Sequence, residues 1–209
     1  MAKQRRIRRL PDDAKREILD AAETLLAERS FSELSVDDLM TGTGMTRSSF
    51  YHYFRGLDEV AIALMRRVQG EMLEATAPWL RTDYDGDPAA GATQGIRASA
   101  EVFARHGLVL SAIHEASFHY ETVQREWREG ILEDWIRAIA AQWRAQHDRG
   151  LTRVADPEEM ARALLLMNNA VFAERLGKQP PDSPERVAET LAEIWVGALY
   201  PGSLAIRRA

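Results

Sequence analysis

Hydrogen-bonding side chains are concentrated in one short stretch of the chain, from residue 46 to residue 52. The stretch carries hydroxyl, guanidinium and imidazole groups on Thr46, Arg47, Ser48, Tyr51 and His52. Groups of this kind pair with phosphate oxygens and with the base edges that line the DNA major groove. The chemistry that the stretch predicts is therefore recognition of double-stranded DNA.

The residues around this stretch predict a helix-turn-helix over residues 35–54. Ser35 caps a first helix by accepting from the backbone N–H of Asp38, and Thr46 caps a second. Gly44 permits the abrupt turn between the two helices. Apolar side chains of the second helix fall at the spacing of one buried face, namely Phe50, Tyr53 and Phe54. Ser35, at the start of the first helix, is a further candidate for DNA contact.

Catalytic and metal-binding alternatives find little support in the residues. There is no phosphate-cradling glycine loop, no paired-histidine helix motif and no hydrolase elbow. Ser111, His114 and Glu115 offer a hydroxyl, a base and an acid, but three polar residues in one helical stretch are more often a solvated or capped face. His114 and His119 lie on different helix faces, and the chain has no cysteine. We expect no enzyme activity, no metal and no cofactor.

Charge is distributed unevenly along the chain of 209 residues, whose net charge is −5. The first ten residues carry five cations and no acid, which leaves 22 cations against 32 acids in the remainder. A solubilising tail or an expression remnant would have this composition too, but directly before a helix-turn-helix a DNA-contacting arm is the better interpretation. We predict an arm over residues 1–10 that contacts phosphates through Arg5, Arg6, Arg8 and Arg9.

The apolar residues, 45% of the chain, suffice for a sizeable core but form no membrane span. The longest apolar run, residues 161–173, is interrupted by Arg162 and two asparagines, and no apolar signal segment follows the cationic start. These features predict a cytoplasmic protein that does not interact with a membrane.

The run from Ile18 to Leu64 resembles the N-terminal DNA-binding domain of the TetR family of bacterial repressors. The residues that carry the resemblance are Ala21-Ala22, Leu25-Leu26, Phe31, Ser35-Val36, Leu39, Gly44-Met45-Thr46, Phe50-Tyr51-His52-Tyr53-Phe54 and Asp58. The resemblance implies an all-α fold of about nine helices, with a three-helix helix-turn-helix domain over residues 11–56 and a larger helical ligand-binding and dimerisation domain over residues 57–209. It also implies a homodimer through the last two helices and a pseudo-palindromic DNA operator.

Helical patterns separated by turn signals continue through the rest of the chain. We predict helices over residues 57–79, 96–106, 108–117, 121–147, 160–176 and 184–199, with no sustained strand alternation. The segment from Thr82 to Pro88, followed by Gly91 and Gly95, predicts a loop, and Gly107 predicts a helix end. The last two helices keep a surplus apolar face, which a copy of the chain covers most simply.

Three tryptophans recur every eight residues in the predicted helix over residues 121–147. At about 100° per residue, Trp127 and Trp143 lie about 160° apart, and Trp135 lies about 80° from each. The helix is therefore expected to pack on a wide arc, with Trp135 the best placed to face an interior cavity. Ordinary core or interface packing is the commoner role of such aromatic residues.

Asn168 and Asn169 stand in an otherwise apolar helix, where an unpaired amide costs about 1–3 kcal/mol. Asn168 shares a face with Leu165 and Phe172, which suits a polar anchor in a ligand pocket. A hydrogen bond to a neighbouring backbone, or a pair across a dimer interface, would satisfy the amide equally well. The residues alone leave these alternatives open.

Within the TetR family, the body resembles the mycobacterial ethionamide-activation repressor subgroup. The matching stretches are Trp135-Ile136, Asp148-Arg149-Gly150, Leu166-Met167-Asn168, Gly177-Lys178-Gln179-Pro180, Ile194-Trp195-Val196 and Leu199-Tyr200. That resemblance implies a channel for elongated apolar ligands, with Asn168 as its amide anchor and a lining of Phe103, Trp135, Ile139, Leu165, Asn168, Phe172 and Trp195. Ala92 and Ser99 stand where the subgroup has bulky aromatic residues, and Leu165 where it has a second asparagine, so channel shape and ligand polarity can differ.

The sequence as a whole predicts a homodimeric transcriptional repressor that a small apolar effector ligand releases from its operator. Such a ligand must bind the two states of the protein with different affinity. The rival interpretation is a helical ligand-binding or scaffold protein whose helix-turn-helix no longer binds DNA. Two features motivate it: the acidic body, and Leu57, which stands where the family usually has a lysine.

Overall fold

The computed structural model describes residues 10–201, and every regular element in that range is helical. The elements, in chain order, are α1 (Pro11–Leu26), the 3-10 turn η1 (Phe31–Glu33), α2 (Val36–Thr43), α3 (Arg47–Phe50), α4 (Leu57–Thr76), α5 (Pro88–His119), α6 (Glu121–Arg125), the π-helical turn η2 (Glu126–Ile131), α7 (Leu132–Asp148), α8 (Pro157–Leu176) and α9 (Pro184–Leu199). The prediction of an all-α fold is confirmed. The candidate arm residues Arg5, Arg6, Arg8 and Arg9 lie outside the described residues.

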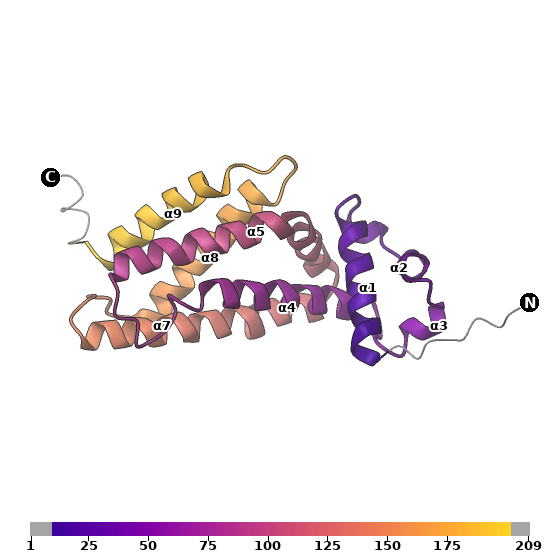
Figure 1. The fold of residues 1–209 in the computed structure, drawn as a ribbon, viewed down its shortest axis with the longest axis horizontal. Helices are drawn as coiled ribbons and strands as arrows, with labels where there is room; N and C mark the ends of the chain where they lie inside the picture. Colours follow the sequence, from indigo (N-terminus) through magenta and orange to yellow (C-terminus); the bar gives the residue numbers. More distant parts are fainter. Residues whose placement is uncertain (1–9, 202–209) are drawn as a thin grey trace, which may run out of the picture.

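A small head and an elongated body are the two parts of the fold (Figure 1). The head consists of α1, η1, α2 and α3, and α1 lies across the end of the long body helices. Buried apolar side chains from these elements form its core, including Ile18, Phe31, Leu39 and Phe50. From the head, α4 runs into the body beside α5.

Caps and a left-handed glycine place the helices of the head. The Ser35 hydroxyl accepts from Asp38 N at 3.2 Å, which confirms the predicted cap, and the Asp38 carboxylate accepts from Ser35 N at 3.1 Å, which completes a capping box. Gly44 ends α2 with a φ of 64°, a conformation that residues with a Cβ rarely adopt. Thr46 caps α3, whose regular part is shorter than predicted and gives way to a turn after Phe50.

The structure of α5 corrects the prediction for residues 82–117. A loop through Gly91 and Gly95 and a helix end at Gly107 are both wrong, because one helix runs through all three glycines. A Cβ on Gly107 would come within 2.2 Å of the Leu176 carbonyl oxygen. This glycine therefore permits close contact between α5 and the end of α8, and does not mark a turn.

The predicted helix over residues 121–147 contains the π-helical turn η2 between α6 and α7. A π turn holds more residues than an α turn, so the regular step of about 100° that we assumed for the tryptophans is wrong across it. Trp127, Trp135 and Trp143 all line one internal cavity. The three tryptophans, which were expected to face different directions, therefore all face the same cavity.

At the centre of the body lies α5, which packs against α4, α8 and α9 and reaches η1 of the head with its C-terminal end. The cavity lies along this helix. Within residues 10–201, no helix is long and apolar enough to cross a membrane. The same range contains no cluster of histidine and carboxylate side chains that could hold a metal ion.

Candidate DNA-reading surface and internal cavity

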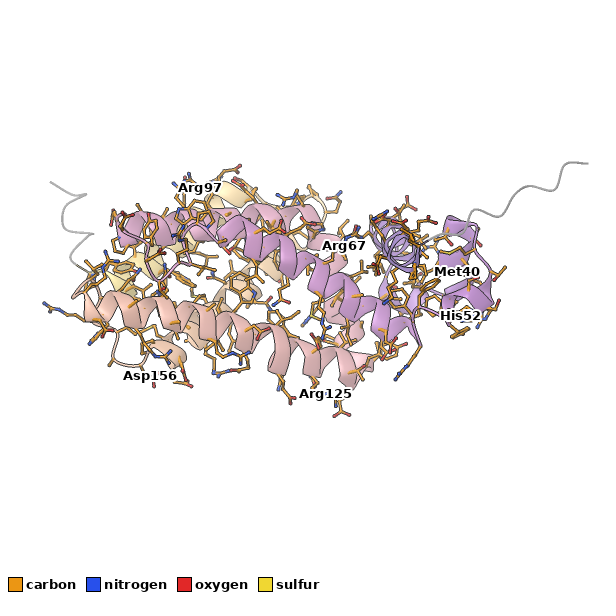
Figure 2. All side chains as sticks on the ribbon, turned by 60° about the horizontal axis from the view of Figure 1, so that its bottom comes forward. Met40, His52, Arg67, Arg97, Arg125 and Asp156 are labelled. Carbon is orange, nitrogen blue, oxygen red and sulfur yellow. The ribbon has the colours of Figure 1, made fainter. Side chains whose placement is uncertain are left out.

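The candidate DNA contacts of the described chain gather on the outer part of the head. Their side chains are exposed at every position, namely Ser35, Thr46, Arg47, Ser48, Tyr51 and His52. Figure 2 shows His52 at the end of the head that points away from the body. The buried faces of α2 and α3, which carry Leu39 and Phe50, hold this surface on the head core.

Arg47 is oriented by two neighbouring side chains. Its Nη1 lies 2.6 Å from Asp37 Oδ2, and its Nη2 donates to the Tyr51 hydroxyl at 3.4 Å. The hydrogen bond to Asp37 raises the pKa of Arg47, whose guanidinium is charged in any case. Because the side chains of the ion pair are 55% and 68% exposed, water screens their attraction, and exchanging Asp37 for a phosphate costs little.

The candidate hydroxyl groups already serve the helix starts. Thr46 Oγ1 accepts from Ser49 N and lies 3.0 Å from Ser48 Oγ. Ser35 Oγ donates to Asp38 at 2.6 Å, and this hydrogen bond lowers the pKa of Asp38. These hydroxyls position the two helix starts. The longer exposed side chains, those of Arg47, Tyr51 and His52, extend furthest from the head.

Arg55 is a cation of the head that the sequence analysis missed. Its side chain is 94% exposed, and it lies two residues before Leu57, whose own side chain packs partly buried against the apolar core. The signal that could have found Arg55 is its place directly after Phe54, at the end of residues 46–54, which we call the recognition segment.

An internal cavity of about 150 Å³ lies in the body among α4, α5, α7, α8 and α9. The structure brings all of the predicted ligand-binding residues to its wall, namely Phe103, Trp135, Ile139, Leu165, Asn168, Phe172 and Trp195. Aromatic contacts link the helices around it: the ring centroids of Phe103 and Phe172 are 5.4 Å apart, and those of Trp143 and Trp195 are 5.7 Å apart. Ala92 and Ser99 also line the cavity.

Sequence reasoning missed the wall that α4 supplies. Side chains from Met65 to Thr76 line the cavity, although none of them was among the predicted ligand-binding residues. It also missed Gln142, which follows Ile139 by three residues and so shares its face of α7. That spacing was the available signal.

The cavity wall is apolar with a few amides. Asn168 is buried, and its Oδ1 accepts from Trp195 Nε1 at 3.0 Å, so the partner is a side chain and not the backbone. Of the described residues that line the cavity, Tyr200 alone is ionisable. Burial raises the pKa of Tyr200 to about 12, and its hydroxyl donates to Gln146 Oε1 at 2.6 Å.

Charged side chains join the head to the body where α1 meets α4 and α5. His106 Nε2 lies 2.9 Å from Glu71 Oε2, and its Nδ1 lies 3.6 Å from Glu23 Oε1 on α1. Arg67 reaches the same Glu23 at 3.5 Å, and Figure 2 shows Arg67 at the boundary between the two parts. The hydrogen bond from His106 lowers the pKa of Glu71.

The polar residues of α5 that offered a hydroxyl and an acid have structural partners. Ser111 Oγ donates to the Gly177 carbonyl at 2.7 Å. The Glu115 carboxylate accepts from the backbone N–H groups of Phe31 and Ser32 at 3.1 and 3.2 Å, and hydrogen bonds from Ser32, that of its side chain first, lower the pKa of Glu115. Ser111 therefore ties α5 to the end of α8, and Glu115 ties it to the head.

An exposed apolar face covers parts of α8 and α9. Leu166 and Ile194 are 46% and 44% exposed, which is unusual for large apolar side chains in a helical body. Small or apolar residues follow the same stripes one turn away and are exposed too, namely Ala163, Ala170, Thr190 and Ala198.

Two protein-family models match the chain. The model described as bacterial regulatory proteins of the tetR family matches residues 18–64, and the model described as the C-terminal domain of the transcriptional regulator EthR matches residues 92–201. The HTH-type transcriptional regulator EthR of Mycobacterium tuberculosis is 35% identical over 191 residues, which cover 90% of this chain and 88% of that protein.

Solved structures share the fold at low identity. Salmonella enterica GusR matches with a TM-score of 0.75 and 18% identity, over 92% of this chain and 98% of that one. A complex with triclosan of SmeT, a repressor from Stenotrophomonas maltophilia, matches with a TM-score of 0.73 and 19% identity, over 90% of this chain and 91% of that one.

Proposed function

This chain belongs to the TetR family of bacterial regulatory proteins, and from this premise we propose that it is a ligand-released transcriptional repressor. It is a regulator and not an enzyme, and it acts in the cytoplasm as a homodimer on a pseudo-palindromic operator. Residues 1–10 form the basic arm, residues 11–56 the DNA-binding domain, and residues 57–209 the ligand-binding and dimerisation domain.

The observation that carries this proposal is that α4 contacts both the head core and the cavity. The helix starts at Leu57 against the head core, and its side chains from Met65 to Thr76 form one wall of the cavity. A ligand that fills the cavity therefore contacts the helix that carries the head. If the ligand binds more tightly when α4 holds the heads at a spacing that misfits the operator, it weakens DNA binding by that difference in affinity.

On DNA, each subunit presents its recognition segment to one major groove. Arg47 and Ser48 lie near base edges, and Tyr51 and His52 reach phosphates or base edges. Thr46 and Ser35 hold the two helix starts close to the backbone. The arginines of the arm add phosphate contacts, and Arg55 supplies a cation beside the position that Leu57 occupies.

The homodimer uses the exposed face of α8 and α9. The exposed residues one helical turn from Leu166 on α8 and from Ile194 on α9 are small. Two copies of the chain can therefore approach closely and bury both large side chains. Self-association of one patch about a two-fold axis is the simplest way to cover it. The resulting four-helix packing would set the distance between the two heads.

The effector is a small apolar molecule that occupies the cavity. The wall of tryptophan, phenylalanine and aliphatic side chains favours such a ligand, and Asn168 supplies a polar anchor among them. Support also comes from the EthR-type C-terminal domain and from the related fold of SmeT, which was solved with triclosan.

The rival interpretation is a protein whose helix-turn-helix no longer binds DNA. To distinguish the two, binding of the protein to DNA fragments upstream of this gene and its neighbours is measured at several salt concentrations. A repressor that neutralises several phosphates loses affinity steeply, with log K falling against log salt. Removal of residues 1–9 should make that slope shallower and weaken binding to all sequences alike. A flat slope for the full chain, or retention of no fragment, would favour the rival.

A further inference from the structure

Four amide side chains line the cavity, those of Gln69, Gln142, Asn168 and Asn169, and two of them are buried and held by the protein in opposite hydrogen-bonding orientations. The first is Asn168, which is 7% exposed and whose Oδ1 accepts from Trp195 Nε1 at 3.0 Å. An indole N–H can only donate, so this bond fixes the orientation of the amide. The group that Asn168 has left to offer is therefore its N–H₂, a donor.

The second amide is Gln142, which is 8% exposed. Its Nε2 donates to the backbone carbonyl of Trp79, just beyond the end of α4. A carbonyl can only accept, so this bond fixes the Gln142 amide in the opposite sense. The group that Gln142 has left to offer is its Oε1, an acceptor.

Neither remaining amide atom has a hydrogen-bond partner within residues 10–201. Both atoms keep some accessible surface, because the only fully buried side-chain polar atom without a hydrogen bond in that range is Glu23 Oε1, at the head junction. Both side chains line the cavity, where a ligand can meet that surface. The wall can therefore offer a donor at Asn168 and an acceptor at Gln142 among mainly apolar side chains, with Gln69 and Asn169 as its other amides.

We propose that the effector is an elongated, uncharged molecule with a hydrogen-bond acceptor for Asn168 and a hydrogen-bond donor, a hydroxyl or N–H, for Gln142. This inference rests on the proposed function, in which the cavity is the effector site. It adds Gln142 as a second anchor. This anchor favours ligands with a hydrogen-bond donor, which apolar side chains alone would not favour.

The shape of the cavity supports an elongated ligand. Along α4 alone, the lining from Met65 to Thr76 extends about 16 Å at the rise of an α-helix. The two anchors belong to different helices, Asn168 to α8 and Gln142 to α7, and different partners hold them, Trp195 and the Trp79 carbonyl. A ligand that reaches both therefore carries two separate polar groups, and a series of chain lengths measures their spacing.

The chemistry of the wall supports an uncharged ligand. Its described residues include no lysine, arginine, histidine or acid, and burial raises the pKa of Tyr200 to about 12, so this phenol is neutral. A carboxylate or ammonium group would lose its hydration without gaining a counter-charge, at a large cost. A ligand without a donor would cost less, but it would leave Gln142 Oε1 unpaired.

Matched probes test the second anchor. The probes are methyl esters of ω-hydroxy fatty acids in a series of increasing chain length, each paired with the ω-methoxy ester, which keeps the ester acceptor and loses the terminal donor. Binding to the full-length dimer is measured by calorimetry and by quenching of tryptophan fluorescence. At the best chain length, the hydroxy ester should bind roughly three- to tenfold more tightly than the methoxy ester. The corresponding ω-hydroxy carboxylate should bind more weakly than its ester.

Two variants assign the preference to its residue. Gln142→Met should bind both esters alike, whereas Asn168→Leu should weaken both and keep the hydroxyl preference. Gln142→Met also loses the hydrogen bond to Trp79, so thermal unfolding is used to show that this variant stays folded. The comparison of the two esters on the wild type does not depend on the variant.

Equal affinity of the wild type for the two esters at every chain length would overturn the second anchor, and so would a preference that persists in Gln142→Met. These results would leave the cavity as the effector site. If the wild type binds none of the esters, the proposed effector site fails, and this inference fails with it.

Discussion

The reading surface of the head and the cavity of the body use hydrogen-bonding side chains in opposite ways. On the head, Arg47 and its partner Asp37 are exposed and screened, so Arg47 can exchange one partner for another at little cost. In the cavity, Asn168 and Gln142 are buried, and each has one half of its amide fixed by a protein partner. The head is therefore suited to strong but salt-sensitive attraction, and the cavity to selection by unmet hydrogen bonds.

The two regions meet along α4 and at the charged junction. His106 on α5 lies between Glu71 of α4 and Glu23 of the head helix α1, and Arg67 of α4 reaches the same Glu23. A movement of α4 would therefore move the head as well. Whether DNA binding and ligand binding can be changed independently is a question for experiment.

Removal of the head core should have the largest effect. Phe50 is fully buried, and Phe50→Ala should cost the head about 3–5 kcal/mol, enough to unfold so small a core. Fluorescence anisotropy with a labelled operator fragment should then show no specific binding, while the hydroxy ester still quenches the cavity tryptophans. Loss of both activities would mean that head and body fold as one unit.

Removal of one exposed cation should have a smaller and purely local effect. Arg47→Ala should weaken operator binding by about 1–3 kcal/mol and leave ester binding unchanged. Arg137 is the matched control, because it is similarly exposed and pairs with Asp134 on the body. If Arg137→Ala weakens DNA binding as much as Arg47→Ala, the reading surface has been assigned to the wrong face.

Truncation of the cavity anchor should give the reverse pattern. Asn168→Ala should weaken ester binding by about 1 kcal/mol and leave ligand-free operator binding nearly intact, because the amide contacts no part of the head. Sedimentation analysis of the same variant gives the control: if the dimer dissociates, Asn168 belongs to the structural core. Trp135→Ala, at the same cavity wall, should likewise spare DNA binding.

The junction should show the smallest effect, and one that depends on pH. Because His106 lowers the pKa of Glu71, the ionised carboxylate stabilises the fold above the ordinary carboxyl range, and this contribution is lost as pH falls through the lower folded pKa. Glu71→Gln should therefore be slightly less stable than wild type near neutral pH, by less than about 1 kcal/mol because the Glu71 side chain is 40% exposed. Denaturant titrations should show the difference shrinking below about pH 4; a difference that grows there would contradict the assignment.

Local signals made the head predictable from sequence, and long-range contacts limited the prediction for the body. Ser35, Thr46 and Gly44 act on their own neighbours, so their caps and turn could be inferred from spacing. Gly107 could not, because its role depends on the approach of Leu176, which is distant in the chain. The π turn depends in the same way on how the helices pack, whereas the place of Gln142 on the cavity wall could have been inferred from its spacing to Ile139.

The alternatives for Asn168 illustrate the same limit. The sequence predicted that a buried amide needs a partner, but it could not name Trp195, which is brought to it by the packing of α9 on α8. The resemblance to a known subgroup named the cavity wall, and the structure supplied what the resemblance lacked, the direction in which each amide points.

The central claim is that occupancy of the cavity changes the affinity of the heads for DNA. The most direct measurement titrates the best ω-hydroxy ester into the dimer bound to its operator fragment, following fragment release by anisotropy and cavity occupancy by tryptophan fluorescence in the same sample. Release should rise in step with occupancy, and in Asn168→Leu both curves should shift together to higher ester concentration. Full occupancy with unchanged operator affinity would contradict the account.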